Sequence, residues 1–176
     1  MSKKLQTVIF LVRHGQTDFP YSNDPTVDDR RRLTEKGQSQ SRRNGRYLKA
    51  FRPTAIYSSP LHRTIETSSI IKELAEIPGE VITGQDLYEI YDNDSFYSIG
   101  KCLPKFFQSI IAKHAGEQVV CVSHQDVIET VLRSYDVSEQ EAEFPCLMGE
   151  MYRLVFAGDV FVQATKLTPA NHEIHR

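Results

Sequence analysis

The stretch VIFLVRHG, residues 8–15, decides the fold that this sequence predicts. Its first five residues are apolar and rich in β-branched side chains, which is typical of a strand buried on both faces. Arg13 and His14 follow at the carboxyl end of that strand, where open α/β sheets place their ligand sites. Arginine can bind a phosphate through two N–H groups, and a histidine ring nitrogen can accept a phosphoryl group. The tripeptide Arg-His-Gly therefore suggests phosphoryl transfer, although a histidine at a strand end is also commonly a hydrogen-bonded structural residue.

Strand and helix patterns alternate along the rest of the chain. After a first strand at residues 7–12, the sequence predicts strands at 54–58, 80–83 and 118–123. Between and after them it predicts helices at 34–51, from residue 60 to the break at 78–79, at 103–114 and from residue 127 onward. Thr34 and Ser59 are the expected N-caps of the first two helices, and Pro60 the first residue of the second. Ser138 opens a further short helix with a capping box.

The last part of the chain predicts a hairpin. Residues 151–157 and 160–167 alternate in polarity around the two-residue turn Gly158-Asp159. Because alternating strands and helices connect through right-handed crossovers, the earlier strands should lie parallel. The fold class that follows is α/β, with a mostly parallel central sheet, helices on both faces and a terminal β-hairpin. The exposed edge of that hairpin offers one way to form an oligomer.

The composition limits the classes of function. With 176 residues, 40% of them hydrophobic, the chain predicts one soluble globular domain over residues 1–176. A net charge of −2 argues against nucleic acid as a partner, so any anion site must be a local cluster of cations. No segment is apolar enough to span a membrane. Three widely spaced cysteines without a Cys-x-x-Cys motif indicate reduced thiols and a cytoplasmic location, and no histidine pair has metal-binding helical spacing.

Two polar segments, residues 18–33 and 84–100, are predicted to be loops that shape a binding site. The first carries the run Arg30-Arg31-Arg32. One interpretation is a rim contact to a substrate carboxylate or a second phosphate. The other, which we favour slightly, is a solvated charge run that partly balances Asp28-Asp29.

Three predicted strands end in polar groups of similar use. The first strand ends at Arg13-His14, the second leads through residues 58–60 to Arg63, and the fourth ends at Ser123-His124. Because the carboxyl ends of parallel strands lie at one edge of a sheet, these residues can meet there. Two arginines, two histidines and a helix N-terminus would form an anion pocket.

Five ordered motifs of the chain resemble those of the histidine phosphatase superfamily, the phosphoglycerate mutase-like group. They are LVRHGQT at 11–17, LTEKGQ at 33–38, YSSPLHRTIET at 57–67, LYE at 87–89 and VSH at 122–124. The resemblance runs from residue 11 to residue 124, and the whole length suits one minimal domain of this group. It implies a phosphoglycerate mutase-like fold and no cofactor or metal.

The resemblance implies a role for each matching residue. His14 would be the nucleophile that forms a phosphohistidine. Arg13, Arg63 and His124 would hold the phosphate and stabilise its transition-state charge, which suits the fixed donor geometry of guanidinium groups. A small phosphorylated substrate, and phosphate or another oxyanion, would therefore occupy this pocket.

Glu89 would be the general acid that protonates the leaving oxygen and then the base that activates water. Asp92 and Asp94 are close rivals for this role in the same segment. An acid of this kind needs a protonated carboxyl, so we expect a raised pKa, with neighbouring tyrosines such as Tyr88 and Tyr91 supplying partial desolvation.

Several residues beside the motifs complete the predicted site or depart from the pattern of the family. Gln16 and Gln125 are expected to contact the substrate. Gln125 stands where the family often has glycine, so its side chain could narrow the pocket, donate a hydrogen bond to the substrate or point away. Pro20 replaces an asparagine that binds phosphate in many members, and Asn93 replaces a glycine.

The leading hypothesis is a metal-independent phosphatase that hydrolyses small phosphomonoesters. The short stretch between Glu89 and His124 favours an open site and hydrolysis. The alternatives within enzymes are a phosphoglycerate mutase-type phosphotransferase and a phosphohistidine protein phosphatase. A different class is a non-catalytic phosphate-binding regulatory module. Nucleic-acid binding through the arginine runs at 30–32 and 42–43 is a weaker hypothesis, because of the net charge.

Overall fold

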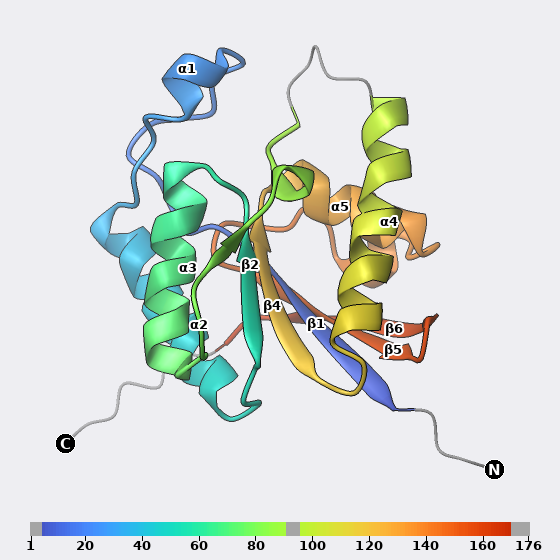
Figure 1. Ribbon diagram of the computed structural model, residues 1–176. Coiled ribbons are helices and arrows are strands. Elements are labelled where there is room, and N and C mark those ends of the chain that lie inside the picture. Colours follow the sequence, from blue (N-terminus) through green and yellow to red (C-terminus); the bar gives the residue numbers. More distant parts are fainter. Residues whose placement is uncertain (1–4, 91–95, 170–176) are drawn as a thin grey trace.

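A six-stranded sheet forms the centre of the molecule (Figure 1). The computed structural model describes residues 5–90 and 96–169, without the side chains of residues 96–101. The sheet order is β3-β2-β4-β1-β5-β6. The strands are β1 (Gln6–Arg13), β2 (Ala55–Ser58), β3 (Ile82–Thr83), β4 (Gln118–Ser123), β5 (Met151–Ala157) and β6 (Val160–Leu167). The first four run parallel to one another, whereas the β5–β6 hairpin adds two antiparallel strands beside β1. The predicted fold class is therefore confirmed.

Helices cover both faces of the sheet. They are α1 (Pro25–Asp28), α2 (Glu35–Lys49), α3 (His62–Ala75), α4 (Phe96–Lys113), α5 (Gln125–Ser134) and α6 (Glu139–Ala142), with a short 3₁₀ turn at Gln85–Leu87. Figure 1 shows α2 and α3 together on one side of the sheet and α4 and α5 on the other.

The apolar side chains of β1 alternate between two cores, because successive residues of a strand point to opposite faces. Val8, Phe10 and Val12 pack with the apolar residues of α2 and α3. Ile9 and Leu11 pack with those of α4 and α5. A strand that is buried on both faces in this way fixes the position of the residues that follow it, beginning with His14.

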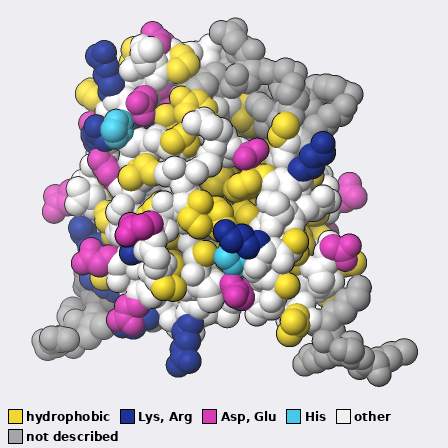
Figure 2. Space-filling model, in the orientation of Figure 1, with side chains coloured by type: hydrophobic (Ala, Val, Ile, Leu, Met, Phe, Trp, Pro, Cys, Tyr) yellow, Lys and Arg dark blue, Asp and Glu magenta, His cyan; other side chains and the backbone are white. Residues whose placement is uncertain are grey.

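The surface carries both signs of charge close together. On the face drawn in Figure 2, Lys and Arg side chains alternate with Asp and Glu side chains, and a group of apolar side chains lies near its centre. Among the described residues, no helix has both the length and the apolar character needed to cross a bilayer.

Three predicted boundaries differ from the structure. The helix expected from Pro60 begins at His62 with Leu61 as its N-cap, because the hydroxyl of Ser59 bonds to a histidine instead of capping the helix. The loop expected at 18–33 contains the short helix α1, and α4 begins within the segment 84–100. Thr34 and Ser138 are N-caps as predicted.

Candidate active site

The carboxyl ends of three parallel strands bring four of the predicted side chains together. In the sheet, Arg13 of β1 lies opposite Ser123 of β4, and Ser58 of β2 lies opposite Val122. His14, the residue after β1, continues this edge, because its amide donates to the carbonyl of Ser123 at 3.1 Å. The site is built from the residues that leave these strands.

His14 is buried and its ring nitrogens have distinct roles. Nδ1 lies 2.8 Å from the carbonyl oxygen of Gly15. A carbonyl only accepts hydrogen bonds, so Nδ1 carries the proton and Nε2 keeps its lone pair. Burial lowers the pKa of His14 well below its ordinary value, and the neighbouring His124 and Arg63 lower it further. The ring is therefore neutral near pH 7, with Nε2 as a basic and nucleophilic atom.

Two glycines hold the segment after His14 against the start of α2. A Cβ atom on Gly15 would lie 2.4 Å from the carbonyl oxygen of Gly37, and one on Gly37 would lie 2.1 Å from the carbonyl oxygen of Gln16. The two backbones can approach this closely only without side chains. The segment after His14 consequently sits on the N-terminal turn of a helix of 15 residues.

Arg13 is fixed by two acceptors on one nitrogen. Its NH1 atom donates to Oε1 of Gln125 at 2.7 Å and to the carbonyl of Cys146 at 2.6 Å. Its Nε atom is buried and has no hydrogen-bond partner within residues 5–90 and 102–169. Gln125 therefore points toward the site, where it orients the guanidinium group through its carbonyl oxygen.

Arg63 is wholly buried and lies among acidic groups. Its NH2 atom contacts Oδ2 of Asp28 at 2.6 Å, Oε2 of Glu89 at 3.2 Å and Nδ1 of His124 at 3.4 Å. NH1 donates to the carbonyl of Asp28 at 3.0 Å, while Nε is buried and has no partner in the described part of the chain. Arg13 and Arg63 thus each have one buried N–H donor that no described residue accepts.

Asp28 is a part of this arrangement that the sequence analysis missed. Its carboxylate lies between Arg63 and Arg31, whose NH1 atom is 2.9 Å from Oδ1. Arg31 is itself buried and donates to the hydroxyl of Thr17. The interpretation of residues 30–32 as a solvated run is therefore wrong for Arg31, because burial forces it to pair with Asp28. The spacing of Asp28 and Arg31, three residues apart, was the feature of the sequence that could have indicated this ion pair.

His124 connects Glu89 to Ser59. Its Nδ1 atom lies 3.0 Å from Oε2 of Glu89, and its Nε2 atom lies 2.9 Å from the hydroxyl of Ser59. Burial lowers the pKa of His124, and the opposing charge of Glu89 does not restore it. The three groups form a line from carboxylate through imidazole to hydroxyl.

The pKa of Glu89 differs from the prediction. Burial alone raises the pKa of this carboxyl, but contacts with His124 and Arg63 outweigh burial, so that the pKa lies below its ordinary value. The expected raised pKa is therefore wrong for the free site, because the guanidinium of Arg63 lies within hydrogen-bond distance. Asp92, Asp94 and Tyr91 lie outside the described residues.

Gln16 bonds to α2, where its Oε1 atom accepts from the hydroxyl of Thr34 at 3.1 Å. Within the described residues, no side-chain hydrogen bond joins Gln16 to the other predicted site residues. Pro20 is exposed on the loop before α1.

The donors of the site could also bind a cation. In the described part of the chain, the ligand atoms of His14, Glu89 and His124 lie within 4.8 Å of one another. A cation there would meet the guanidinium of Arg63, which touches both Glu89 and His124. Because like charges repel strongly in a buried site, this constellation suits an anion better than a metal ion.

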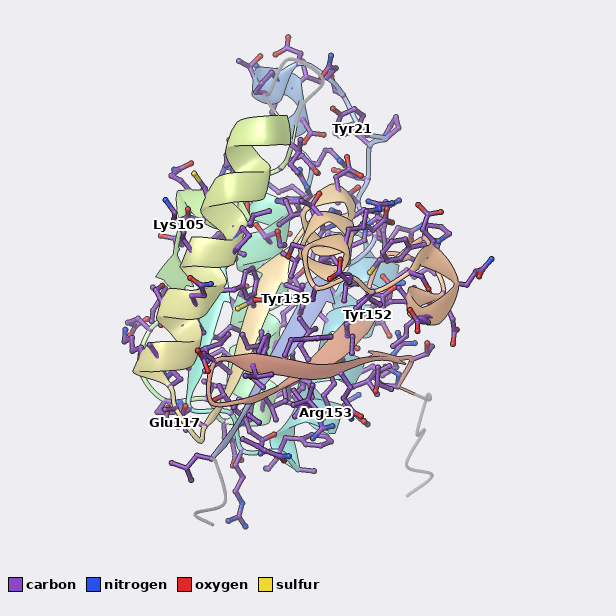
Figure 3. All side chains as sticks on the ribbon, turned by 90° about the vertical axis from the view of Figure 1, so that its right-hand side faces the viewer. Tyr21, Lys105, Glu117, Tyr135, Tyr152 and Arg153 are labelled. Carbon is purple, nitrogen blue, oxygen red and sulfur yellow. The ribbon has the colours of Figure 1, made fainter. Side chains whose placement is uncertain are left out.

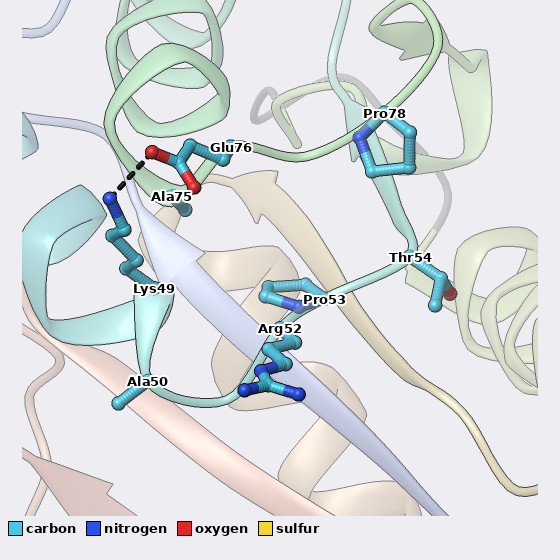
Figure 4. A pocket seen from close by; sticks show the side chains of 8 residues that line it. All are labelled: Lys49, Ala50, Arg52, Pro53, Thr54, Ala75, Glu76 and Pro78. Atoms are coloured by element: carbon cyan, nitrogen blue, oxygen red, sulfur yellow. Dashed lines mark hydrogen bonds and ion pairs between the residues drawn. The ribbon is translucent and has the colours of Figure 1, made fainter.

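Away from this site, the described residues form aromatic contacts and a surface ion pair. The hairpin packs on α5 through aromatic rings, with Tyr135 stacked on Phe161 at 4.8 Å, and Tyr152 donates to the carbonyl of Ala142 (Figure 3). A pocket of about 590 Å³ lies at the opposite end of β2 from the site (Figure 4). Its charged residues are exposed, and two of them, Lys49 and Glu76, form an ion pair.

Residues 9–93 match the model of the histidine phosphatase superfamily (branch 1), which confirms the resemblance in the four motifs between residues 11 and 89. The fifth motif, at 122–124, lies outside the matched residues. Over 70 residues the chain is 39% identical to a 2,3-bisphosphoglycerate-dependent phosphoglycerate mutase of Corynebacterium diphtheriae, covering 39% of this chain and 28% of the mutase. Over 72 residues it is 36% identical to an uncharacterised phosphatase, PhoE, of Bacillus subtilis, covering 41% of this chain and 37% of that protein. The matches thus span well under half of either relative.

The fold is similar to that of a phosphoserine phosphatase from Entamoeba histolytica in complex with 3-phosphoglyceric acid. The two structures superpose with a TM-score of 0.76 at 20% sequence identity, over 94% of this chain and 98% of the other. This likeness confirms the phosphoglycerate mutase-like fold.

Proposed function

We propose that this chain is a member of the histidine phosphatase superfamily that hydrolyses small phosphomonoesters through a phosphohistidine on His14 and without a metal ion. The observation that carries the proposal is the pairing of one nucleophile with two cations. Nε2 of His14 bears a lone pair, and Arg13 and Arg63 each keep a buried N–H donor without a partner among the described residues. Phosphoryl transfer depends mainly on positioning and on countercharge, and this site supplies both.

The first half of the reaction transfers the phosphoryl group to the enzyme. Nε2 of His14 attacks phosphorus, the N–P bond forms, and the bond between phosphorus and the ester oxygen breaks. Arg13, Arg63 and His124 hold the equatorial oxygens. Glu89 protonates the departing oxygen, which leaves as an alcohol.

The second half regenerates the enzyme. Glu89, now a carboxylate, takes a proton from water, whose oxygen attacks phosphorus while the N–P bond breaks. Inorganic phosphate leaves and His14 is again neutral. Glu89 must be protonated for the first half of the reaction, and a bound phosphate dianion would favour its protonated form. Its negative charge offsets Arg63 and raises the pKa of the neighbouring carboxyl.

Charges around the site favour a substrate with a single phosphate. Arg31 is paired with Asp28, and Arg32 lies 3.6 Å from Glu66. Asp126 lies at the start of α5. Burial raises the pKa of Asp126, and the nearby charge of Glu89 raises it further. A second phosphate or a carboxylate on the substrate would therefore meet compensated cations and an extra acid. This supports hydrolysis of monoesters over mutase chemistry on a bisphosphate.

The proposal is tested by turnover of an aryl phosphate in excess chelator, comparing the wild type with His14→Ala. We expect hydrolysis that survives chelation and is lost in the variant. Turnover that depends on added metal, or that persists without His14, would overturn the proposed mechanism. Turnover only with bisphosphates would favour the mutase, and phosphate binding without turnover of any monoester would favour the regulatory module. The protein-phosphatase alternative predicts activity on a phosphohistidine peptide instead.

The state of the cysteines bears on the cellular compartment in which the protein works. The three cysteines are free, and two of them, Cys121 and Cys146, are buried. Burial raises the pKa of the Cys146 thiol to about 12, so it is not reactive near the site. These features suit a reducing compartment, and we propose a cytoplasmic enzyme that uses no cofactor and whose partner is its small phosphorylated substrate.

A further inference from the structure

Ser59 is a polar residue that contacts His124 and that the proposed mechanism does not use. It is fully buried at the end of β2, and its hydroxyl lies 2.9 Å from Nε2 of His124. The sequence assigns Ser59 to helix capping, yet α3 has no side-chain cap. The amide of Leu61 lies 3.5 Å from this hydroxyl, which makes a long and weak contact. The short contact of this hydroxyl is therefore with the imidazole.

The backbone holds Ser59 in one place. Its amide donates to the carbonyl of Val122 on β4 at 3.0 Å. Its carbonyl accepts from the hydroxyls of Ser58 at 2.8 Å and Thr64 at 2.9 Å. The hydroxyl of Ser59 consequently approaches His124 from a rigid position, as a group that orients a catalytic side chain must.

The contacts of His124 determine which ring nitrogen carries its proton. Nδ1 faces Oε2 of Glu89 at 3.0 Å, and an ionised carboxylate can only accept a hydrogen bond. The proton of the neutral ring is then on Nδ1, and Nε2 accepts from the hydroxyl of Ser59. Nδ1 is also the nitrogen next to NH2 of Arg63, at 3.4 Å. The N–H group of His124 thus points to Glu89, beside Arg63.

We propose that Ser59 is a positioning residue, whose hydroxyl donates to Nε2 of His124 and, together with Glu89 at Nδ1, holds the imidazole in one orientation with its proton facing Glu89 and Arg63. The inference rests on the proposed function for its effect on catalysis, but the hydrogen bond itself is independent of it. Without the hydroxyl, the buried lone pair of Nε2 has no donor, and only the contact with Glu89 orients the ring. The N–H group of His124 would then be held less firmly beside Arg63.

Ser59→Ala tests this, with Ser58→Ala as the matched control. Ser58 is the preceding residue and is equally buried, but its hydroxyl bonds to the carbonyl of Ser59 and not to the imidazole. In Ser58→Ala that carbonyl keeps its bond from Thr64, so Ser59 stays in place. We expect Ser59→Ala to lower kcat/KM for an aryl phosphate by about 10-fold to about 100-fold, somewhat less than removal of a transition-state donor itself. Ser58→Ala should change it less than about threefold. Ser59→Thr, which keeps a hydroxyl, should recover activity relative to Ser59→Ala.

The decisive readout is the ¹⁵N spectrum of the histidine side chains in the full chain, with His124 assigned by its absence from His124→Asn. We expect a protonated Nδ1 and an unprotonated Nε2 in the wild type, Ser58→Ala and Ser59→Ala, with the Nε2 resonance of Ser59→Ala alone shifted downfield because it has lost the hydrogen bond from the hydroxyl. The inference is overturned if Ser59→Ala leaves the Nε2 resonance of His124 unchanged, or if both serine variants shift it alike. If the wild type hydrolyses no phosphate ester, the proposed function fails, while the Nε2 resonance still decides whether Ser59 holds His124.

Discussion

At the scale of single residues, the site depends on two buried histidines that stay neutral. His14 and His124 both have lowered pKa values because burial disfavours the charged ring, with the Arg63 charge nearby as a further cause. Neutrality serves the mechanism, since a protonated Nε2 of His14 could not attack phosphorus. The same burial links the site to stability.

Stability should fall as the pH drops below about 6.5, the ordinary histidine value. In that range the unfolded chain takes up protons on His14 and His124, whereas the folded chain takes up fewer, so acid favours unfolding. Each histidine contributes up to about 1.4 kcal/mol per pH unit in this window, until its folded pKa is reached. Urea unfolding at pH 7 and pH 5.5 measures the effect. His14→Asn should reduce this pH dependence, and an unchanged slope would show that His14 is not a neutral buried ring.

If Glu89 is the general acid, the effect of Glu89→Gln on the rate should depend on the leaving group of the substrate. The amide cannot protonate the departing oxygen, so kcat for an alkyl phosphate should fall by about 10²-fold to 10⁴-fold. A nitrophenyl phosphate, whose leaving group needs no proton, should retain much more of its phosphorylation rate in rapid-mixing experiments. Asp126→Asn, which removes an exposed carboxylate nearby, is the control. Equal losses on both substrates would contradict the role of Glu89 as an acid.

Asp28→Asn should destabilise the protein by about 3 kcal/mol, because it leaves Arg63 and Arg31 without their buried countercharge. Asp29→Asn is matched in sequence, but Asp29 is 44% exposed and lies 3.9 Å from His62, so its loss should change stability by less than about 0.5 kcal/mol. Chemical denaturation of the two variants separates them. If both cost the same, the Asp28 pairs would contribute nothing.

At the scale of elements, close packing of helices fixes the site. Gly45 lies where α2 crosses α3, and a Cβ atom there would lie 2.8 Å from Cβ of Leu74 and 3.2 Å from Cα of Ile71. The two helices meet along this contact, and both lead to site segments, at Gly37 and at Arg63.

Gly45→Ala should therefore destabilise the protein by about 1–3 kcal/mol, the usual cost of overpacking, even though alanine is the better helix former by about 1 kcal/mol. Arg46→Ala, on the exposed side of the same helix, should stay within about 0.5 kcal/mol. Thermal unfolding measures both. A stabilised Gly45→Ala would mean that helix propensity outweighs the close approach of α2 and α3.

The sequence predicts elements better than it predicts the contacts between loops. The apolar run at 8–12 and the motif residues at strand ends placed Arg13, His14 and His124 at one edge, because parallel topology leaves little choice. Asp28 and Ser59 could not be assigned in the same way. Their roles depend on where the 18–33 loop folds back and on which hydrogen bond a hydroxyl chooses, and residue type alone does not determine either. The lowered pKa of Glu89 likewise depends on the arrival of Arg63 from another element.

At the scale of the whole molecule, the distribution of charge favours one kind of substrate. The chain has a net charge of −2, so attraction of phosphate comes from the few buried cations of the site. Paired arginines and the acid at the start of α5 surround them. We expect kcat/KM for a naphthyl phosphate to exceed that for 3-phosphoglycerate, and the ratio to fall at high salt as rim repulsion is screened. The reverse order would contradict the charge argument and favour the mutase.

The central claim is the covalent intermediate on His14, and a rapid-quench experiment tests it most directly. The wild type is mixed with a ³²P-labelled monoester in excess chelator, quenched in alkali within milliseconds, and digested to peptides. We predict acid-labile label on the peptide that contains residues 11–17, and none in His14→Asn. Turnover of the ester with no label on this peptide, or with label on the peptide that contains His124, would contradict the account.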